Sequence, residues 1–208
     1  MDIQYYGANC VVVSNKHVRI VIDDNLATLG AKQIVKDGDV CLFTGPHDAI
    51  KGQPKIVIDQ PGEYEVSGVS VFGLQARSHM DEDATKSSVI YKLSIGDLRI
   101  VVTGHIYPKL TDSQLEAIGM IDLLVVPVGG NGYTLDATGA LEIIKNIEPK
   151  LVVLTHYADS SLNYPVPQQS LEDVLKNIPM EPKDTVKKLQ LKSSELSDST
   201  QLMIIERS

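Results

Sequence analysis

The sequence predicts an α/β (α+β) fold, a four-layer αββα sandwich of two mixed β-sheets with helices on the outside. Short apolar runs separated by turn residues fill the first half of the chain, and strands alternate with helices in the second half. Strand-rich halves that each recruit helices are typical of two stacked sheets rather than of a helical bundle. The chain shows no short repeat period and no long linker, so we expect a single domain over residues 1–208.

The first half is expected to be almost entirely β-structure, because its apolar runs are short and bounded by turn residues. Gly96-Asp97 between two such runs is a strong signal for a two-residue hairpin. One short helix is expected in this half, around Ala31–Val35. The strands are expected at Ile3–Tyr6, Cys10–Ser14, Val18–Ile22, Val40–Phe43, Ile56–Ile58, Tyr64–Val66, Val69–Leu74, Val89–Ile95 and Leu98–Val102.

The second half carries the helix signals. Thr111 and Gln114 have the spacing of a capping box and predict a helix through Ile118. Asp136 is expected to cap a helix that runs to Asn146. A third helix is expected over Gln169–Asn177. The continuous apolar runs Leu123–Val128 and Leu151–Thr155 predict strands that are buried on both faces. Two further strands are expected at the end of the chain, over Val186–Leu191 and Gln201–Glu206.

Composition excludes several classes of protein. The net charge of −8 and the sequence pI near 5.1 argue against a nucleic-acid partner, which calls for a concentrated basic surface. No stretch approaches the roughly 20 apolar residues of a membrane span, and the N-terminus lacks the pattern of a signal peptide. The two cysteines, Cys10 and Cys41, lie in apolar runs and form no C-x-x-C motif, which fits a reducing compartment. We therefore expect a cytoplasmic protein.

Four of the five histidines, His47, His79, His105 and His156, each lie just past a predicted strand. At the end of a strand the chain continues into a loop, so side chains at several strand ends can converge on one edge of the sheets. Neutral imidazole is a good ligand for zinc and neighbouring metals. The pattern predicts a functional pocket at this edge, and the alternative is a set of histidines that only form hydrogen bonds.

Several segments resemble the metallo-β-lactamase fold superfamily, and within it the small cytoplasmic metal-dependent hydrolases similar to the ascorbate-6-phosphate lactonase branch. The resemblance covers nearly the whole chain and implies an αββα sandwich with a metal site on one edge between the sheets. The segments that carry it are Tyr6-Gly7-Ala8-Asn9-Cys10, Val21-Ile22-Asp23, Pro61-Gly62-Glu63-Tyr64-Glu65-Val66, Leu115-Glu116-Ala117-Ile118-Gly119, Asp122 to Gly130, and Pro149 to Val153 leading into His156-Tyr157.

The resemblance also shows which metal ligands this chain lacks. In the family, the side chains of a loop with the pattern His-x-His-x-Asp-His coordinate two metal ions. Aligned on Thr44, this loop offers Gly45, His47, Ala49 and Ile50 at the four ligand positions, so three of them are lost. His79 and His156 match later ligands of the family, His105 stands where the family has a bridging aspartate, and Ala8 replaces a histidine of the first hairpin.

The missing ligands argue against a two-metal centre. A shared carboxylate usually bridges two such ions, and this chain has His105 at that position. One metal could still bind to His47, His79 and His105 with an open position for water, and His156 would then be a fourth ligand or an acid/base. Zinc is the metal expected for an all-imidazole shell. The alternative is no metal at all, with the histidines bonded to one another or to Asp48, Asp81 and Asp159.

Other residues are expected around this pocket. Asp23 stands where the resemblance places a carboxylate that orients a ligand, and Asp48 is an alternative ligand if the loop shifts by one position. The glycine-rich loop that includes Gly130 is expected to form one wall. Tyr133 and Tyr157 could present phenol groups to a substrate, although ordinary packing would also account for them.

Two functions remain open from the sequence. The first is a hydrolase with a remodelled, at most mononuclear site, in which a metal-bound hydroxide attacks an ester, lactone or phosphoester. The second is a catalytically inactive member that keeps the fold for binding or assembly. The expected partner is a small-molecule substrate, without nucleic acid or membrane, and a homo-oligomer is left open.

Overall fold

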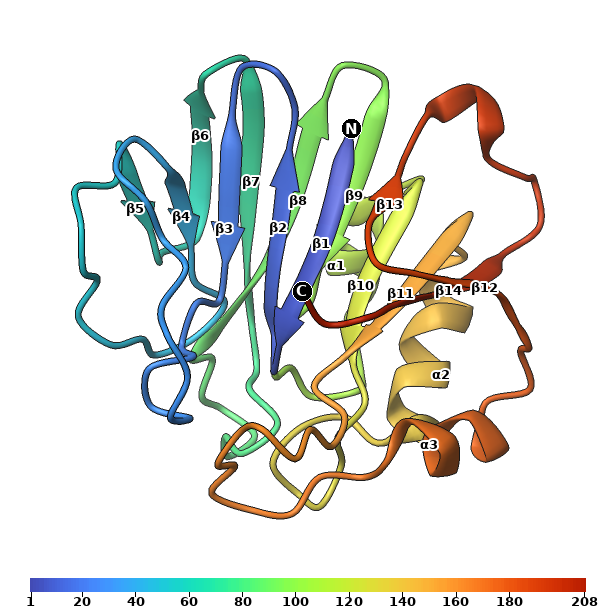
Figure 1. Ribbon diagram of the computed structural model, residues 1–208. Helices are drawn as coiled ribbons and strands as arrows, with labels where there is room; N and C mark the ends of the chain where they lie inside the picture. Colours follow the sequence, from blue (N-terminus) through green and yellow to red (C-terminus); the bar gives the residue numbers. More distant parts are fainter.

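A computed structural model describes residues 1–208 as two stacked β-sheets with three α-helices outside them (Figure 1). The six-stranded sheet has the order β13 (Leu189–Gln190), β1 (Asp2–Gly7), β2 (Cys10–Ser14), β3 (Arg19–Ile22), β4 (Val40–Leu42) and β5 (Ile56–Ile58). Strands β13 to β3 pair antiparallel, and β3, β4 and β5 pair parallel, so this sheet is mixed.

The eight-stranded sheet is also mixed. Its order is β12 (Pro182–Val186), β14 (Gln201–Ile205), β11 (Leu151–Thr155), β10 (Leu123–Pro127), β9 (Leu98–Val102), β8 (Ser88–Ile95), β7 (Val69–Ala76) and β6 (Gly62–Val66). Strands β12 to β9 run parallel, and β9 to β6 form an antiparallel meander. The two mixed sheets confirm the predicted fold class.

Two apolar cores hold these layers together. A cluster of 27 buried residues fills the space between the sheets and draws on both ends of the chain, from Ile3 to Ile205. A second cluster of 21 buried residues lies between the eight-stranded sheet and the helices α1 (Asp112–Ile118), α2 (Ala137–Ile147) and α3 (Leu171–Asn177). Strands β10 and β11 are buried along their whole length, since they contribute to both cores, as their continuous apolar sequences predict.

The helix starts follow from their caps. The Thr111 hydroxyl accepts a hydrogen bond from the Gln114 amide and the Gln114 side chain bonds back to the Thr111 amide, as the capping box predicts. The Asp136 carboxylate accepts from the Gly139 amide at 2.8 Å at the start of α2. Helix α3 begins at Leu171 after its cap Ser170, slightly later than expected.

The helix expected around Ala31–Val35 is wrong, because that segment is an irregular loop. The amides of Ile34 and Val35 donate to the Asp24 carboxylate at 2.6 and 2.9 Å, so they are not available for helical hydrogen bonds. This loop packs on the outer face of the six-stranded sheet through a small apolar cluster that includes Leu26. The outer layer on this side is therefore loop, and all three helices cover the other sheet (Figure 1).

The strand expected over Val186–Leu191 is also wrong as a single element. Strand β12 ends at Val186 in the eight-stranded sheet, and β13 pairs Leu189 with Ile3 of β1 in the other sheet. Lys187-Lys188 forms the crossover between the sheets, which an apolar pattern along one segment cannot reveal. A short 3-10 helix, η1 (Ser193–Glu195), follows. None of the helices combines the length and the apolar character that a membrane span requires.

Candidate functional site

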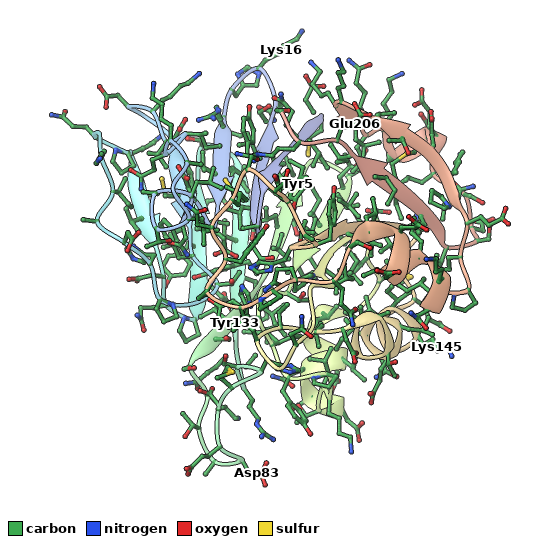
Figure 2. All side chains as sticks on the ribbon, turned by 60° about the horizontal axis from the view of Figure 1, so that its bottom comes forward. Tyr5, Lys16, Asp83, Tyr133, Lys145 and Glu206 are labelled. Atoms are coloured by element: carbon green, nitrogen blue, oxygen red, sulfur yellow. The ribbon has the colours of Figure 1, made fainter.

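A cavity of about 400 Å³ opens at the edge where several strands end, in the region that the histidine pattern predicts. The loops after β10 and β11 lie along this edge, at the bottom of Figure 1. Figure 2 brings the edge forward and shows Tyr133 where these loops converge, with the loop that carries Asp83 projecting away from the body. The lining includes His47, His105, His156, Asp23, Asp48 and Tyr133, but contains no lysine or arginine.

His105 and His156 form a close pair in this cavity. Their ring centroids lie 4.5 Å apart with the rings nearly perpendicular, at 84°. His105 follows Gly104 at the end of β9, and His156 follows β11 in a left-handed conformation with φ of 58°. The His156 amide donates to the carbonyl of Ala8 at 2.8 Å, which fixes this ring against the first hairpin of the other sheet.

Hydrogen bonds define which nitrogen of each ring carries the proton. Gln168 Nε2 donates to the carbonyl of Val166, so its Oε1 accepts from Nδ1 of His156 at 3.0 Å. Nδ1 of His105 lies 3.3 Å from the carbonyl of Tyr133, which can only accept. Both rings therefore hold their proton on Nδ1 and keep a lone pair on Nε2.

Burial keeps both imidazoles uncharged. Loss of hydration lowers the pKa of His105 to about 3, and the neighbouring His156 adds to this effect. Burial likewise lowers the pKa of His156 to about 4, although its hydrogen bond to Gln168 works in the opposite direction. The pair is neutral at pH 7.

Asp23 is held by Thr44 in the floor of the cavity. Its two carboxylate oxygens accept from the amide and the hydroxyl of Thr44, both at 2.7 Å. Burial raises the pKa of Asp23 to about 6, and the two hydrogen bonds limit that rise. Gly104 approaches Thr44 so closely that an added Cβ would lie 2.0 Å from the hydroxyl oxygen. Asp23 thus positions the end of β4, and both of its carboxylate oxygens accept hydrogen bonds from Thr44.

His47 lines the cavity but is turned toward its own loop. Its ring stacks on Phe43 with centroids 3.9 Å apart and an angle of 20°. Its Nδ1 donates to the carbonyl of Asp48 at 2.7 Å, and its Nε2 lies 3.4 Å from a carboxylate oxygen of Asp59. The Asp48 side chain lines the cavity and has no hydrogen-bond or ion-pair partner.

His79 lies in a second cavity, of about 340 Å³, together with Gly130 and the start of α2. Its amide donates to the carbonyl of His105 at 2.7 Å, but its Nδ1 is buried without a partner. Gly130 therefore forms a wall of this second cavity. Tyr157 lines neither cavity, because its ring packs against Tyr5 at 5.5 Å and its hydroxyl donates to the carbonyl of Ile205.

The structure adds two cavity residues, Asn9 and Tyr164, and one partner of His156, Gln168, that the sequence did not single out. Asn9 is buried, and its Nδ2 has no hydrogen-bond partner while its Oδ1 accepts from Thr155. Tyr164 lies 5.2 Å from His156 between ring centroids, and Gln168 fixes the His156 tautomer. Asn9 belongs to the first-hairpin motif and could have been proposed from it, whereas the loop of Tyr164 and Gln168 carries no recognisable pattern.

The four histidines do not come together as one ligand set. His105 and His156 pair, His47 is stacked on Phe43, and His79 faces another cavity. No group of three or more histidine, cysteine, aspartate or glutamate side chains in the protein has the geometry to hold a metal ion. The cavity therefore brings together the two neutral imidazoles of His105 and His156 and the neighbouring rings of Tyr133 and Tyr164.

Comparisons with known proteins agree on the fold. A curated relative, a UPF0173 protein of Pyrococcus abyssi, is 26% identical over 183 residues, which are 76% of this chain and 83% of that protein. A UPF0173 metal-dependent hydrolase of Carboxydothermus hydrogenoformans is 33% identical over 67 residues, 32% of this chain and 29% of that protein.

Solved structures match along nearly the whole chain. One is described as a candidate Zn-dependent hydrolase of the metallo-β-lactamase superfamily from Thermotoga maritima. It has a TM-score of 0.74 and 25% identity, and the match covers 99% of this chain and 98% of that one. A metallo hydrolase from Ignicoccus hospitalis shares the fold, with a TM-score of 0.60, 15% identity and coverage of 98% and 94%.

The family follows from these matches. A model of the family described as the β-lactamase superfamily domain matches residues 2–156, which include the strands and loops that deliver His47, His79, His105 and His156. This confirms the superfamily that the sequence motifs indicated. The chain belongs to the β-lactamase superfamily domain family and has the metallo-β-lactamase fold.

Proposed function

We propose that this protein binds a small molecule in the cavity around His105 and His156 without metal-dependent hydrolysis. The observation that carries the proposal is the separation of the four histidines, of which only these two converge. The cavity has a volume of about 400 Å³, which lies in the size range of small-molecule binding sites. The proposed protein is thus a metallo-β-lactamase-fold member with a binding pocket in place of a metal centre.

The donor set does not fit the metal that the family implies. The Carboxydothermus relative is called metal-dependent and the Thermotoga protein is described as Zn-dependent, so a metal cofactor belongs to the family. Catalytic zinc is normally held by three protein ligands. Here two neutral imidazoles remain, and the oxygens of Asp23 are taken by Thr44. Family membership alone does not restore the lost donors.

One observation favours the second candidate, a hydrolase with a single zinc ion. Histidines that bind metals usually donate their other ring N–H to a carbonyl or carboxylate, and both His105 and His156 do so. For a third ligand, either His47 would have to leave its stack on Phe43 or His79 its separate cavity. This candidate therefore requires a rearrangement of at least one loop.

Zinc titration of protein purified without a His-tag separates the two candidates. We expect no stoichiometric zinc after purification and no tight binding by calorimetry, whereas the Thermotoga relative treated in the same way serves as the positive control. Stoichiometric tight binding that disappears in His105→Gln and His156→Asn would overturn the proposal in favour of the single-zinc hydrolase. A chelator should leave the melting temperature of this protein unchanged if the proposal is correct.

We also place the protein in the cytoplasm. Cys10 and Cys41 are both buried free thiols in the structure. Burial raises the pKa of Cys10 well above its usual range and that of Cys41 to about 12, so neither thiol is ionised at neutral pH. Unreactive buried thiols without a disulfide accord with a reducing compartment. Oxidant-free fractionation of the source cells would test this placement.

A further inference from the structure

The charged groups of the cavity are all of one sign. Among its 19 lining residues there is no lysine and no arginine, and the carboxylates are Asp23 and Asp48. Asp23 is bonded to Thr44, but the half-buried Asp48 carboxylate has no partner. A pocket that contains unpaired negative charge and no positive side chain attracts cations and repels anions.

Aromatic rings form one wall of the same cavity. His105, Tyr133, His156 and Tyr164 all line it. The centroid separations are 4.9 Å for His105–Tyr133, 4.5 Å for His105–His156, 5.9 Å for Tyr133–His156 and 5.2 Å for His156–Tyr164. The rings are inclined to one another by 42° to 84° and pack in direct contact, so they form one continuous aromatic cluster that lines the cavity. Aromatic faces bind organic cations, and clusters of rings of this kind recognise alkylated ammonium groups.

Asn9 supplies a complementary polar group. It is only 6% exposed, it lines the cavity, and its Nδ2 donates no hydrogen bond within the protein. A buried amide donor without a partner is costly, so a ligand with an acceptor oxygen would gain from bonding to it. In the observed orientation, Oδ1 of Asn9 accepts from the Thr155 hydroxyl at 3.2 Å, which leaves Nδ2 as the free end of the amide.

From these three observations we infer that the cavity binds a small organic cation, an alkylated ammonium compound that also carries a hydroxyl or carbonyl oxygen. The aromatic wall and Asp48 would receive the cationic end, and Asn9 would donate to the oxygen. This inference rests on the proposed function, because a metal dication in the same cavity would repel a cationic ligand.

Calorimetric titration with choline chloride tests the inference on the full chain at pH 7.5. The matched probes are 3,3-dimethyl-1-butanol, which has the same shape without the charge, and 3,3-dimethylbutyrate, which is an anion. We expect choline to bind at least about tenfold more tightly than the alcohol, because cation–π attraction and an unpaired carboxylate act together on the charge. The anion should not bind measurably.

Variants assign the contacts. Tyr133→Leu should weaken choline binding about fivefold or more, the effect of one lost cation–π partner. Tyr64→Leu, outside the cavity, should not change it. Asp48→Asn should weaken choline binding, whereas Asp97→Asn at the exposed β8–β9 turn should not. Asn9→Ala should weaken choline but leave tetramethylammonium unaffected, since that cation has no oxygen.

Three results would overturn the inference and leave the proposed function standing: equal binding of choline and the alcohol, preference for the anion, or no choline binding to zinc-free protein. Stoichiometric zinc binding would instead overturn the proposed function. The choline titration is therefore run on protein whose zinc content has been measured, so that the two failures are distinguishable.

Discussion

Gly45 stands where the family resemblance predicts a histidine ligand, and the structure leaves room for a side chain at this position. It lines the same cavity as His105 and His156, and an added Cβ would meet no atom within 4 Å. A side chain can therefore be placed there without displacing its neighbours. If the proposed function is correct, the number of well-placed donors, and not a lack of space, limits zinc binding in this cavity.

Under the proposed function, Gly45→His is expected to create tight zinc binding. The new imidazole would join His105 and His156 and supply the three nitrogen ligands that catalytic zinc sites use. Calorimetry with zinc chloride measures the gain, and Gly45→Gln is the control of similar size without an imidazole. Equal weak binding by the two variants would show that geometry, and not ligand number, is limiting.

The two buried imidazoles should also make stability depend on pH. Their pKa values in the folded protein, about 3 for His105 and about 4 for His156, lie below the usual 6.5. The unfolded chain therefore binds more protons below pH 6.5, so their contribution favours the folded state above that pH and is lost as the pH falls, toward about 4 for His156 and about 3 for His105. Asp23 acts in the opposite direction, because its pKa is raised to about 6 and protonation of the folded state relieves its burial.

Replacement of His156 isolates one of these contributions. In His156→Asn the free energy of unfolding should fall less steeply between pH 6.5 and 4.5, by up to about 1.4 kcal/mol per pH unit for one proton. Asparagine tolerates the left-handed conformation found at this position. Urea denaturation at several pH values gives the slope, and His17→Asn, at an exposed turn, is the control. An unchanged slope would mean that His156 is protonated in the folded state.

At the level of elements, Thr44 is the residue that joins strand ends from both sheets. Its amide and hydroxyl bond to Asp23 after β3, and its carbonyl accepts from the Val89 amide in β8 at 2.8 Å. Gly104 after β9 packs directly against it, in the left-handed region with φ of 60°. The end of β4 is thus fixed against β3, β8 and β9, which defines the floor of the cavity.

Gly104→Ala should be far more destabilising than an alanine at another left-handed glycine. Gly68 has a similar φ of 73° but no atom within 4 Å of an added Cβ, so Gly68→Ala should cost only about 1 kcal/mol. At Gly104 the clash with Thr44 adds about 1–3 kcal/mol of overpacking. Urea denaturation of the two variants compares them directly, and equal losses of stability would show that Thr44 can move aside at little cost.

Elements could be predicted from the sequence where local chemistry decides them. The caps Thr111 and Asp136 act within one helical turn, and both helices begin as expected. Ala31–Val35 is not a helix because a carboxylate ten or more residues away, Asp24, takes its amides. Val186–Leu191 is divided because pairing with β1, at the other end of the chain, draws Leu189 into the second sheet. Tertiary partners of this kind leave no local pattern.

The same distinction applies to the candidate site. The sequence places the histidines at strand ends, and the cavity lies there, but it does not show where each ring points. His47 is turned by its stack on Phe43, and His79 enters the second cavity beside α2. These orientations depend on contacts between elements that assemble only in the folded protein. That Gly45, Ala49 and Ile50 carry no metal-ligating side chain can be read from the sequence directly.

For the whole molecule, the contact between the two sheets is mostly apolar, but several hydrogen bonds cross it, and one of them comes from a buried tyrosine. The hydroxyl of Tyr91, in β8 of the eight-stranded sheet, donates to the carbonyl of Ile58 in β5 at 3.1 Å. Strand β5 is the edge strand of the six-stranded sheet, and the Ile58 carbonyl also accepts from the Phe43 amide at 3.0 Å. Burial raises the pKa of Tyr91 far above its usual range, so the phenol is always available as a donor.

Tyr91→Phe should destabilise the protein by about 1 kcal/mol, because it removes one buried hydrogen bond and exchanges no apolar volume, while the Ile58 carbonyl keeps its bond from the Phe43 amide. Tyr64→Phe is the matched control, since the Tyr64 hydroxyl also donates to a backbone carbonyl, that of Gln60, at 3.0 Å, but in an exposed position. There water replaces the lost partner, and the cost should stay below about 0.5 kcal/mol. Urea denaturation of both variants measures the difference. Equal effects would mean that the apolar core alone fixes the spacing of the sheets, and that the cavity at their edge does not depend on this bond.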